Sequence, residues 1–158
     1  MRPRLTLLAA AVGLLAASAG PYDIALHSTQ AAPTARGRAR LVPTGSPYGV
    51  DVTADGHASY DVMITVTGLP SPGRLGKFTT FVAWAALPDL SRWERLGSVR
   101  NGTSTVGPVE LNKFLLVITA EADSAPAAHT GPTVLHGTSP SGWLQSFLTH
   151  PLFRGVTQ

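Results

Sequence analysis

The chain contains no cysteine. Disulfide bonds, thiolate metal sites and cysteine nucleophiles are therefore excluded. A domain without disulfides has to be held together by its apolar core, and a chain of 158 residues is long enough for one such core but not for two. The sequence therefore predicts a single domain.

Charged residues are scarce as well. They make up 13% of the chain, beside 16 glycines and 13 prolines. Exposed helices are rich in Glu and Lys, whereas short strands joined by tight turns use Gly and Pro. The composition thus favours an all-β protein, and the series of short strand and turn signals predicts an immunoglobulin-like antiparallel β-sandwich over residues 38–138.

Several motifs of enzymes and cofactor-binding proteins are missing. The sequence has no Gly-x-Ser-x-Gly nucleophile turn, no phosphate-binding loop and no dinucleotide fingerprint. Asp51, Asp55 and Asp61 do not have the spacing of a helix-loop-helix calcium site. We therefore expect a non-enzymatic protein without a cofactor.

The long apolar run of the chain lies at its N-terminus. Arg2 and Arg4 precede an apolar stretch over residues 5–17, and small residues follow at 17–19. A membrane-spanning helix needs about 20 apolar residues, and this run is shorter. The pattern predicts a cleaved signal peptide at 1–19 and an extracytoplasmic location. The alternative is an uncleaved anchor, which would make the protein a membrane-tethered envelope regulator.

Cleavage would lower the net charge from +3 to +1, because the segment contains Arg2 and Arg4 but no acid. Such a charge does not favour nucleic acid, so we expect the partner to be a protein or a cell-envelope component. A membrane is expected as partner only if the N-terminal segment stays uncleaved. Arg36, Arg38 and Arg40 alternate with small residues, and we interpret residues 20–37 as a flexible lead-in.

Two segments carry the strongest strand signals. In residues 57–69, Tyr60, Val62, Ile64 and Val66 share one face of a period-two pattern. Residues 77–86 are apolar on both faces, which is typical of a central strand.

Three further elements follow. Asn101-Gly102 predicts a type I′ turn joining residues 93–99 and 103–110 as a hairpin, which explains the dipeptide better than a glycosylation sequon does. Residues 113–122 and 133–135 are expected to form two more strands. The tail, residues 139–158, is expected to form a short helix whose apolar stripe includes Trp143.

The candidate site residues surround the loop between those last two strands. A metal or hydrolytic site would require Glu121, Asp123, His129 and His136 to converge, with ligand atoms roughly 2 Å from a shared ion. The five histidines are scattered, and no pair has helical i, i+4 spacing. Solvated side chains at strand ends are the interpretation we prefer, with no metal site.

Aromatic side chains are the other candidates. Trp84 and Tyr60 are expected in the core. Trp93 lies among charged neighbours at a strand edge, and we expect Trp93 and Trp143 to contribute to a partner surface.

The order of three pieces resembles a known family. Phe81-Val82-Ala83-Trp84-Ala85 is followed by Leu96-Gly97, then by a strand ending in Thr119-Ala120-Glu121, and lastly by Thr130-Gly131-Pro132-Thr133-Val134-Leu135. Over about residues 59–137 this is similar to the C-terminal, extracytoplasmic domain of anti-sigma-K factors.

The resemblance implies a β-sandwich outside the cytoplasm that binds or senses rather than catalyses. It makes Glu121 a strand-end acid and Thr130-Gly131-Pro132 a turn, neither of them catalytic. Two departures stand out. The family carries a sigma-binding region and a transmembrane helix ahead of this domain, where here a predicted signal precedes it. Its Pro-Gly-Gly-Ser-like loop is replaced by residues 122–126.

Overall fold

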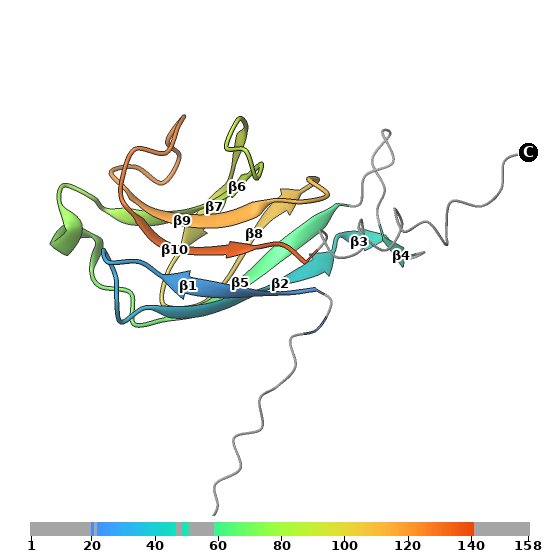
Figure 1. The fold of residues 1–158 in the computed structure, drawn as a ribbon, viewed down its shortest axis with the longest axis horizontal. Helices are drawn as coiled ribbons and strands as arrows, with labels where there is room; N and C mark the ends of the chain where they lie inside the picture. Colours follow the sequence, from blue (N-terminus) through green and yellow to red (C-terminus); the bar gives the residue numbers. More distant parts are fainter. Residues whose placement is uncertain (1–19, 21, 47–48, 51–58, 141–158) are drawn as a thin grey trace, which may run out of the picture.

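The computed structural model describes residues 20, 22–46, 49–50 and 59–140 (Figure 1). Eight antiparallel strands form one nearly closed sheet in the order β7-β6-β9-β10-β1-β2-β5-β8. The bounds are β1 (Asp23–Ser28), β2 (Arg36–Pro43), β5 (Tyr60–Thr67), β6 (Thr80–Ala86), β7 (Trp93–Val99), β8 (Gly102–Val109), β9 (Leu115–Glu121) and β10 (Thr133–Thr138). The prediction of an all-β protein is confirmed.

Two small elements complete the described part of the chain. Strands β3 (Gly45–Ser46) and β4 (Gly49–Val50) pair only with each other, and the 3-10 helix η1 (Pro72–Leu75) lies between β5 and β6. Among the described residues, no helix has the length and apolar character needed to cross a membrane.

Alternation along the strands explains where the core lies. In β5, Val62, Ile64 and Val66 are fully buried, whereas Met63 is 40% exposed. This is the face predicted from the period-two pattern. Strand β6 is buried along nearly its whole length and hydrogen bonds to both β7 and β9, so the prediction of a central strand is also confirmed. Both halves of the sheet contribute to one core cluster.

The predicted hairpin at residues 93–110 was wrong in its pairing. Strands β7 and β8 have nearly the expected bounds, but they form the two free edges of the sheet. A type I′ turn needs positive φ at both central residues, and here Gly102 has φ 98° while Asn101 is not in that region. The connection instead crosses the open seam between the two edges.

Asn101 explains why the connection takes this path. Its Oδ1 accepts a hydrogen bond from the Leu69 amide at 3.0 Å, and its Nδ2 donates to the Leu69 carbonyl at 2.9 Å. The side chain thus completes the backbone hydrogen bonding of a residue 32 positions earlier. This long-range bond competes with the local turn that the dipeptide favours.

The predicted flexible lead-in, residues 20–37, contains a strand of the sheet. In β1, buried Ile24 and Leu26 alternate with exposed Ala25 and His27. Residues 23–26 pair with β2, and His27 and Ser28 pair with β10. The strand is short and polar on one face, so its alternation is apparent only once its two neighbours are known.

Two predictions fall on residues that the structure does not describe, and a third is left open by the strand order. The signal peptide at 1–19 and the tail helix beyond residue 140, with Trp143, lie outside the described residues. The strand order gives one hydrogen-bonded sheet and leaves the immunoglobulin-like sandwich unconfirmed.

Candidate functional site

The outer face of β9 is buried although it points away from the central core. Leu116, Ile118 and Ala120 belong to the core cluster, so their neighbours Thr119 and Glu121 project from the opposite face. Thr119 is nevertheless 1% exposed and Glu121 is 0% exposed. The loop between β9 and β10 lies over this face, and it is held there by Glu121.

Glu121 accepts hydrogen bonds from three residues. Thr119 Oγ1 donates to Oε1 at 2.6 Å, and Thr130 Oγ1 donates to Oε2 at 2.8 Å. The Thr130 amide lies 3.1 and 3.2 Å from the two carboxylate oxygens, and the Gly131 amide lies 3.4 Å from Oε1. We call these four residues the Glu121 clamp. Every partner is a donor, so the carboxylate is satisfied in its charged form.

Electrostatics agree with this geometry. Burial raises the pKa of Glu121, but the hydrogen bonds from Thr119, Thr130 and Gly131 outweigh it, so the pKa lies below its ordinary value. A carboxylic acid kept charged and fully bonded is poorly suited to general acid catalysis. The clamp therefore holds the loop in place.

Gly131 fixes the end of the loop. A Cβ atom at this position would lie 1.6 Å from the Ala120 carbonyl oxygen, so the backbone approaches β9 closely enough that only glycine fits. The next residue, Pro132, accepts a hydrogen bond from the Ala120 amide at 3.0 Å.

Three aromatic side chains pack next to the clamp, and they extend from buried Trp84 to exposed His129. Trp84 Nε1 donates to Thr119 Oγ1 at 2.9 Å, so this buried tryptophan shares a hydroxyl with Glu121. His129, on the clamped loop, meets Trp84 edge-on at 6.1 Å between ring centroids and stacks on Trp93 at 3.8 Å. The loop and the start of β7 are thereby fixed to each other.

The turn between β6 and β7 presents a leucine beside these rings. Leu90 has φ 62°, the one non-glycine residue with positive φ among those described, and it is 53% exposed. Trp93 Nε1 donates to the Leu90 carbonyl at 3.1 Å, and the Asp89 carboxylate accepts from the Ser91 amide and hydroxyl. This turn and the clamped loop project from the same side of the molecule (Figure 1). We call the result the Leu90–Trp93–His129 surface.

The four candidate metal or catalytic residues do not converge. Glu121 is enclosed in its clamp, while exposed Asp123 accepts from the Ala125 amide within its own turn. His129 stacks on Trp93, and His136 lies across from His27 on β1. Within the part of the chain that the structure describes, no group of three or more His, Asp or Glu is placed to hold a metal ion.

Trp93 is partly buried at the start of β7, as expected for a strand edge. Sequence reasoning missed Leu90 and His27. The signal for Leu90 was a large apolar residue inside a Pro-Asp-Leu-Ser turn, and that for His27 was its place in an alternating strand. Trp143 lies beyond the described residues.

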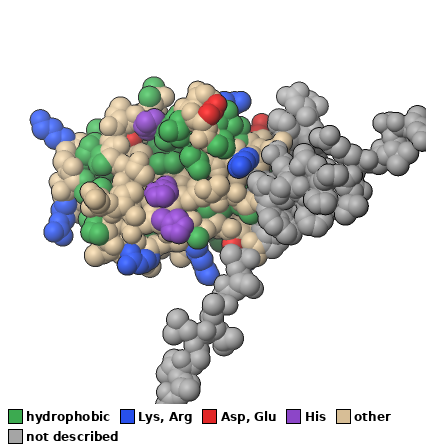
Figure 2. Space-filling model, in the orientation of Figure 1, with side chains coloured by type: hydrophobic (Ala, Val, Ile, Leu, Met, Phe, Trp, Pro, Cys, Tyr) green, Lys and Arg blue, Asp and Glu red, His purple; other side chains and the backbone are tan. Residues whose placement is uncertain are grey.

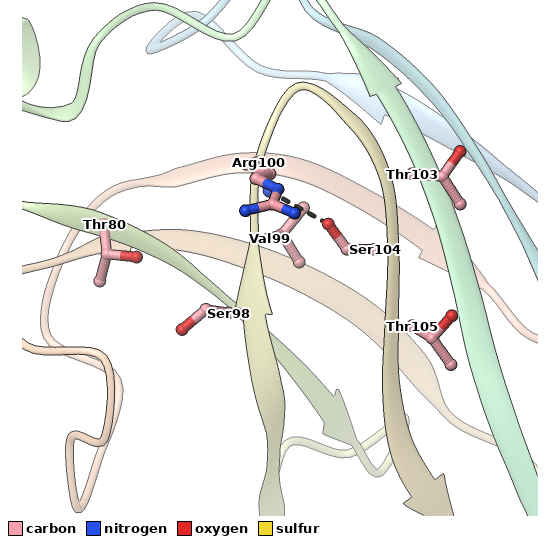
Figure 3. Close-up of a pocket in the computed structure, with 7 residues that line it drawn as sticks. All are labelled: Thr80, Ser98, Val99, Arg100, Thr103, Ser104 and Thr105. Carbon is pink, nitrogen blue, oxygen red and sulfur yellow. Dashed lines mark hydrogen bonds between the residues drawn. The ribbon is translucent and has the colours of Figure 1, made fainter.

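A hollow of about 450 Å³ opens at the seam between the free edges (Figure 3). Its described lining is Thr80, Ser98, Val99, Arg100, Thr103, Ser104 and Thr105. Ser104 Oγ accepts from the Arg100 amide at 3.3 Å. These side chains supply hydroxyls and one cation but no base that would activate a hydroxyl, so they do not make a catalytic pair.

Comparison with known proteins adds no relative to this description: no family model, curated protein or solved structure matches the chain.

Proposed function

We propose that this protein is an exported, non-enzymatic binding module and that the Leu90–Trp93–His129 surface contacts its partner, a protein of the cell envelope. One observation carries the proposal. Leu90 is held in a backbone conformation that β- and γ-branched residues seldom adopt, and its side chain is 53% exposed. Strained positions of this kind cost about 1–3 kcal/mol and cluster at functional sites.

The neighbours of Leu90 favour a protein as the partner. Binding hot spots of protein interfaces are enriched in tryptophan, tyrosine and arginine. Trp93 supplies the aromatic ring, and it is fixed by its bond to Leu90 and by stacking on His129. The Glu121 clamp makes the support rigid, because the loop carrying His129 is bonded to β9 by Thr130 and Gly131.

The resemblance to the extracytoplasmic domain of anti-sigma-K factors is kept as part of this proposal. Two of the motifs behind it are Thr119-x-Glu121, at the end of β9, and Thr130-Gly131-Pro132, at the end of the following loop, and hydrogen bonds to Glu121 join them. That contact explains why the two motifs would occur together: each supplies one side of the same hydrogen-bonded contact. We also propose that the sheet halves face each other as layers of an immunoglobulin-like sandwich, since β1 pairs with β2 through residues 23–26 and with β10 through His27 and Ser28.

Site-specific photo-crosslinking in the native host tests the binding surface. A photoreactive residue at Leu90, in the full chain with its own N-terminus, is expected to give one discrete protein adduct in the extracytoplasmic fraction. Met63 is the matched control, because it is a similarly exposed apolar residue on β5. The identified partner should then bind the purified protein at least 10-fold more weakly after Trp93→Ala.

Equal labelling from positions 63 and 90, or a protein confined to the cytoplasm, would contradict the proposal. A full-length product in the membrane fraction would instead support the membrane-tethered regulator with an uncleaved N-terminal segment.

A further inference from the structure

His27 and His136 lie directly opposite each other on the outer face of the sheet. They are register partners in the antiparallel pair β1 and β10, and their ring centroids are 5.9 Å apart with planes tilted by 44°. Both side chains are exposed. Figure 2 shows histidine side chains gathered on the face that β1 and β10 present. We propose that this pair binds a divalent transition-metal ion of the copper, nickel or zinc class.

The spacing suits two imidazoles on one ion. A ligating nitrogen lies about 2.1 Å from such an ion, which places each ring centroid roughly 3 Å from it. Two rings on opposite sides of an ion are therefore separated by up to about 6 Å, and small rotations of the exposed side chains bring the nitrogens into place. Imidazole is a preferred ligand of these metals, with Cu²⁺ binding most tightly.

The surroundings leave the pair accessible. On one side His136 lies opposite Val117, which is apolar and buried. On β2, which pairs with β1 as far as Leu26 and Gly37, the guanidinium of Arg36 donates to the carbonyls of Pro33 and Ala35. Two protein ligands leave the other coordination positions to water, so the site differs from a closed structural site with four ligands.

Because His27 and His136 lie on different strands, a bound ion would affect the stability of the sheet. Strands β1 and β10 share only two register pairs, His27 with His136 and Ser28 with Leu135, whereas β2 and β5 share eight. An ion bound by both histidines would link β1 to β10 across this short pairing. Because the two histidines are held side by side only in the folded state, the ion would bind that state more tightly and stabilise it.

Titration of the purified full-length protein with Cu²⁺ and Zn²⁺ tests the site. We expect a Cu²⁺ EPR spectrum with coupling to two nitrogens, and a melting temperature raised by about 4–8 °C at saturating Zn²⁺. Mg²⁺ should produce neither effect, because it prefers oxygen ligands.

Three variants decide the assignment. His27→Ala and His136→Ala should each abolish the two-nitrogen signal and the Zn²⁺-dependent shift, while leaving the melting temperature without metal nearly unchanged. His129→Ala is the control and should keep both effects. Two-nitrogen binding that persists in the His27→Ala/His136→Ala double variant, or the absence of any shift in the unmodified protein, would overturn the proposal.

Discussion

Glu121 shows how one residue can turn a loop into a fixed part of the molecule. Its carboxylate is buried on the outer face of β9, where it would be unstable without partners. Four donor groups from Thr119, Thr130 and Gly131 meet it there. The sequence pointed to this stretch, and we expected Glu121 to be a strand-end acid without a catalytic role. It could not show the clamp, because the eight residues between Glu121 and Thr130 have no pattern that predicts their path.

Glu121→Gln should destabilise the protein by about 2 kcal/mol at pH 7, because an amide nitrogen cannot accept from Thr130 and a charged hydrogen bond is lost. The pKa of Glu121 is lowered in the folded state. Its contribution is therefore fully present above the ordinary pKa of about 4.5 and is lost as the pH falls through the folded value. Urea unfolding between pH 7 and pH 3 should show a shallower acid slope in the variant.

Asp123→Asn is the control, since this exposed side chain bonds only within its own turn in the described structure. It should change stability by less than about 0.5 kcal/mol. If the Glu121→Gln protein kept the same free energy of unfolding and the same acid slope, the clamp would not contribute to stability.

At the scale of elements, strand positions were easier to predict than strand partners. The buried faces of β5 and β6 follow from alternation, which is a local property of the sequence. The pairing of β7 and β8 depends on contacts between distant segments. Asn101 bonds to Leu69 and leaves the two strands at opposite edges of the sheet. A local turn signal contains no information about that competition.

Asn101→Ala should lower the free energy of unfolding by about 1–3 kcal/mol, because the amide and carbonyl of Leu69 lose their partner in a partly buried site. Denaturant unfolding measures the change. Asn112→Ala is the matched control on an exposed position and should have an effect within about 0.5 kcal/mol. Equal effects of the two substitutions would contradict the structural role of Asn101.

The molecule as a whole is a sheet that almost closes on itself. Within the described part of the chain, seven antiparallel pairings join the eight strands of this sheet, and β7 and β8 at its two edges are not paired with each other. Without cysteine, this arrangement and its core must supply the stability. The composition predicted the class of fold correctly, while the near closure depends on β1, whose strand character the sequence did not reveal.

Amide hydrogen exchange, followed by NMR, should show that the strand edges at the seam between β7 and β8 are not hydrogen-bonded to each other. We expect the slowest exchange in β9, which pairs with β6 and β10 and is buried on both faces. In β8, the amides that do not bond to β5 should exchange at least 100-fold faster. Strand β5 serves as the comparison, because it also has one exposed face but is paired on both sides. Equally slow amide exchange in β5, β8 and β9 would contradict this expectation, because it would show that the free edge of β8 is hydrogen-bonded.

The meeting of β1 and β10 has a consequence for the order in which the chain is synthesised. Thr29 Oγ1 donates to the carbonyl of Thr133, which is made 104 residues later. A ribosome adds about 5–20 residues per second, so β1 and β2 exist for several seconds before β10 does. During that interval the His27 end of β1 lacks its neighbour. The sheet can therefore be completed only after β10 has been synthesised, and a truncation before residue 133 would leave this end of β1 without its neighbour.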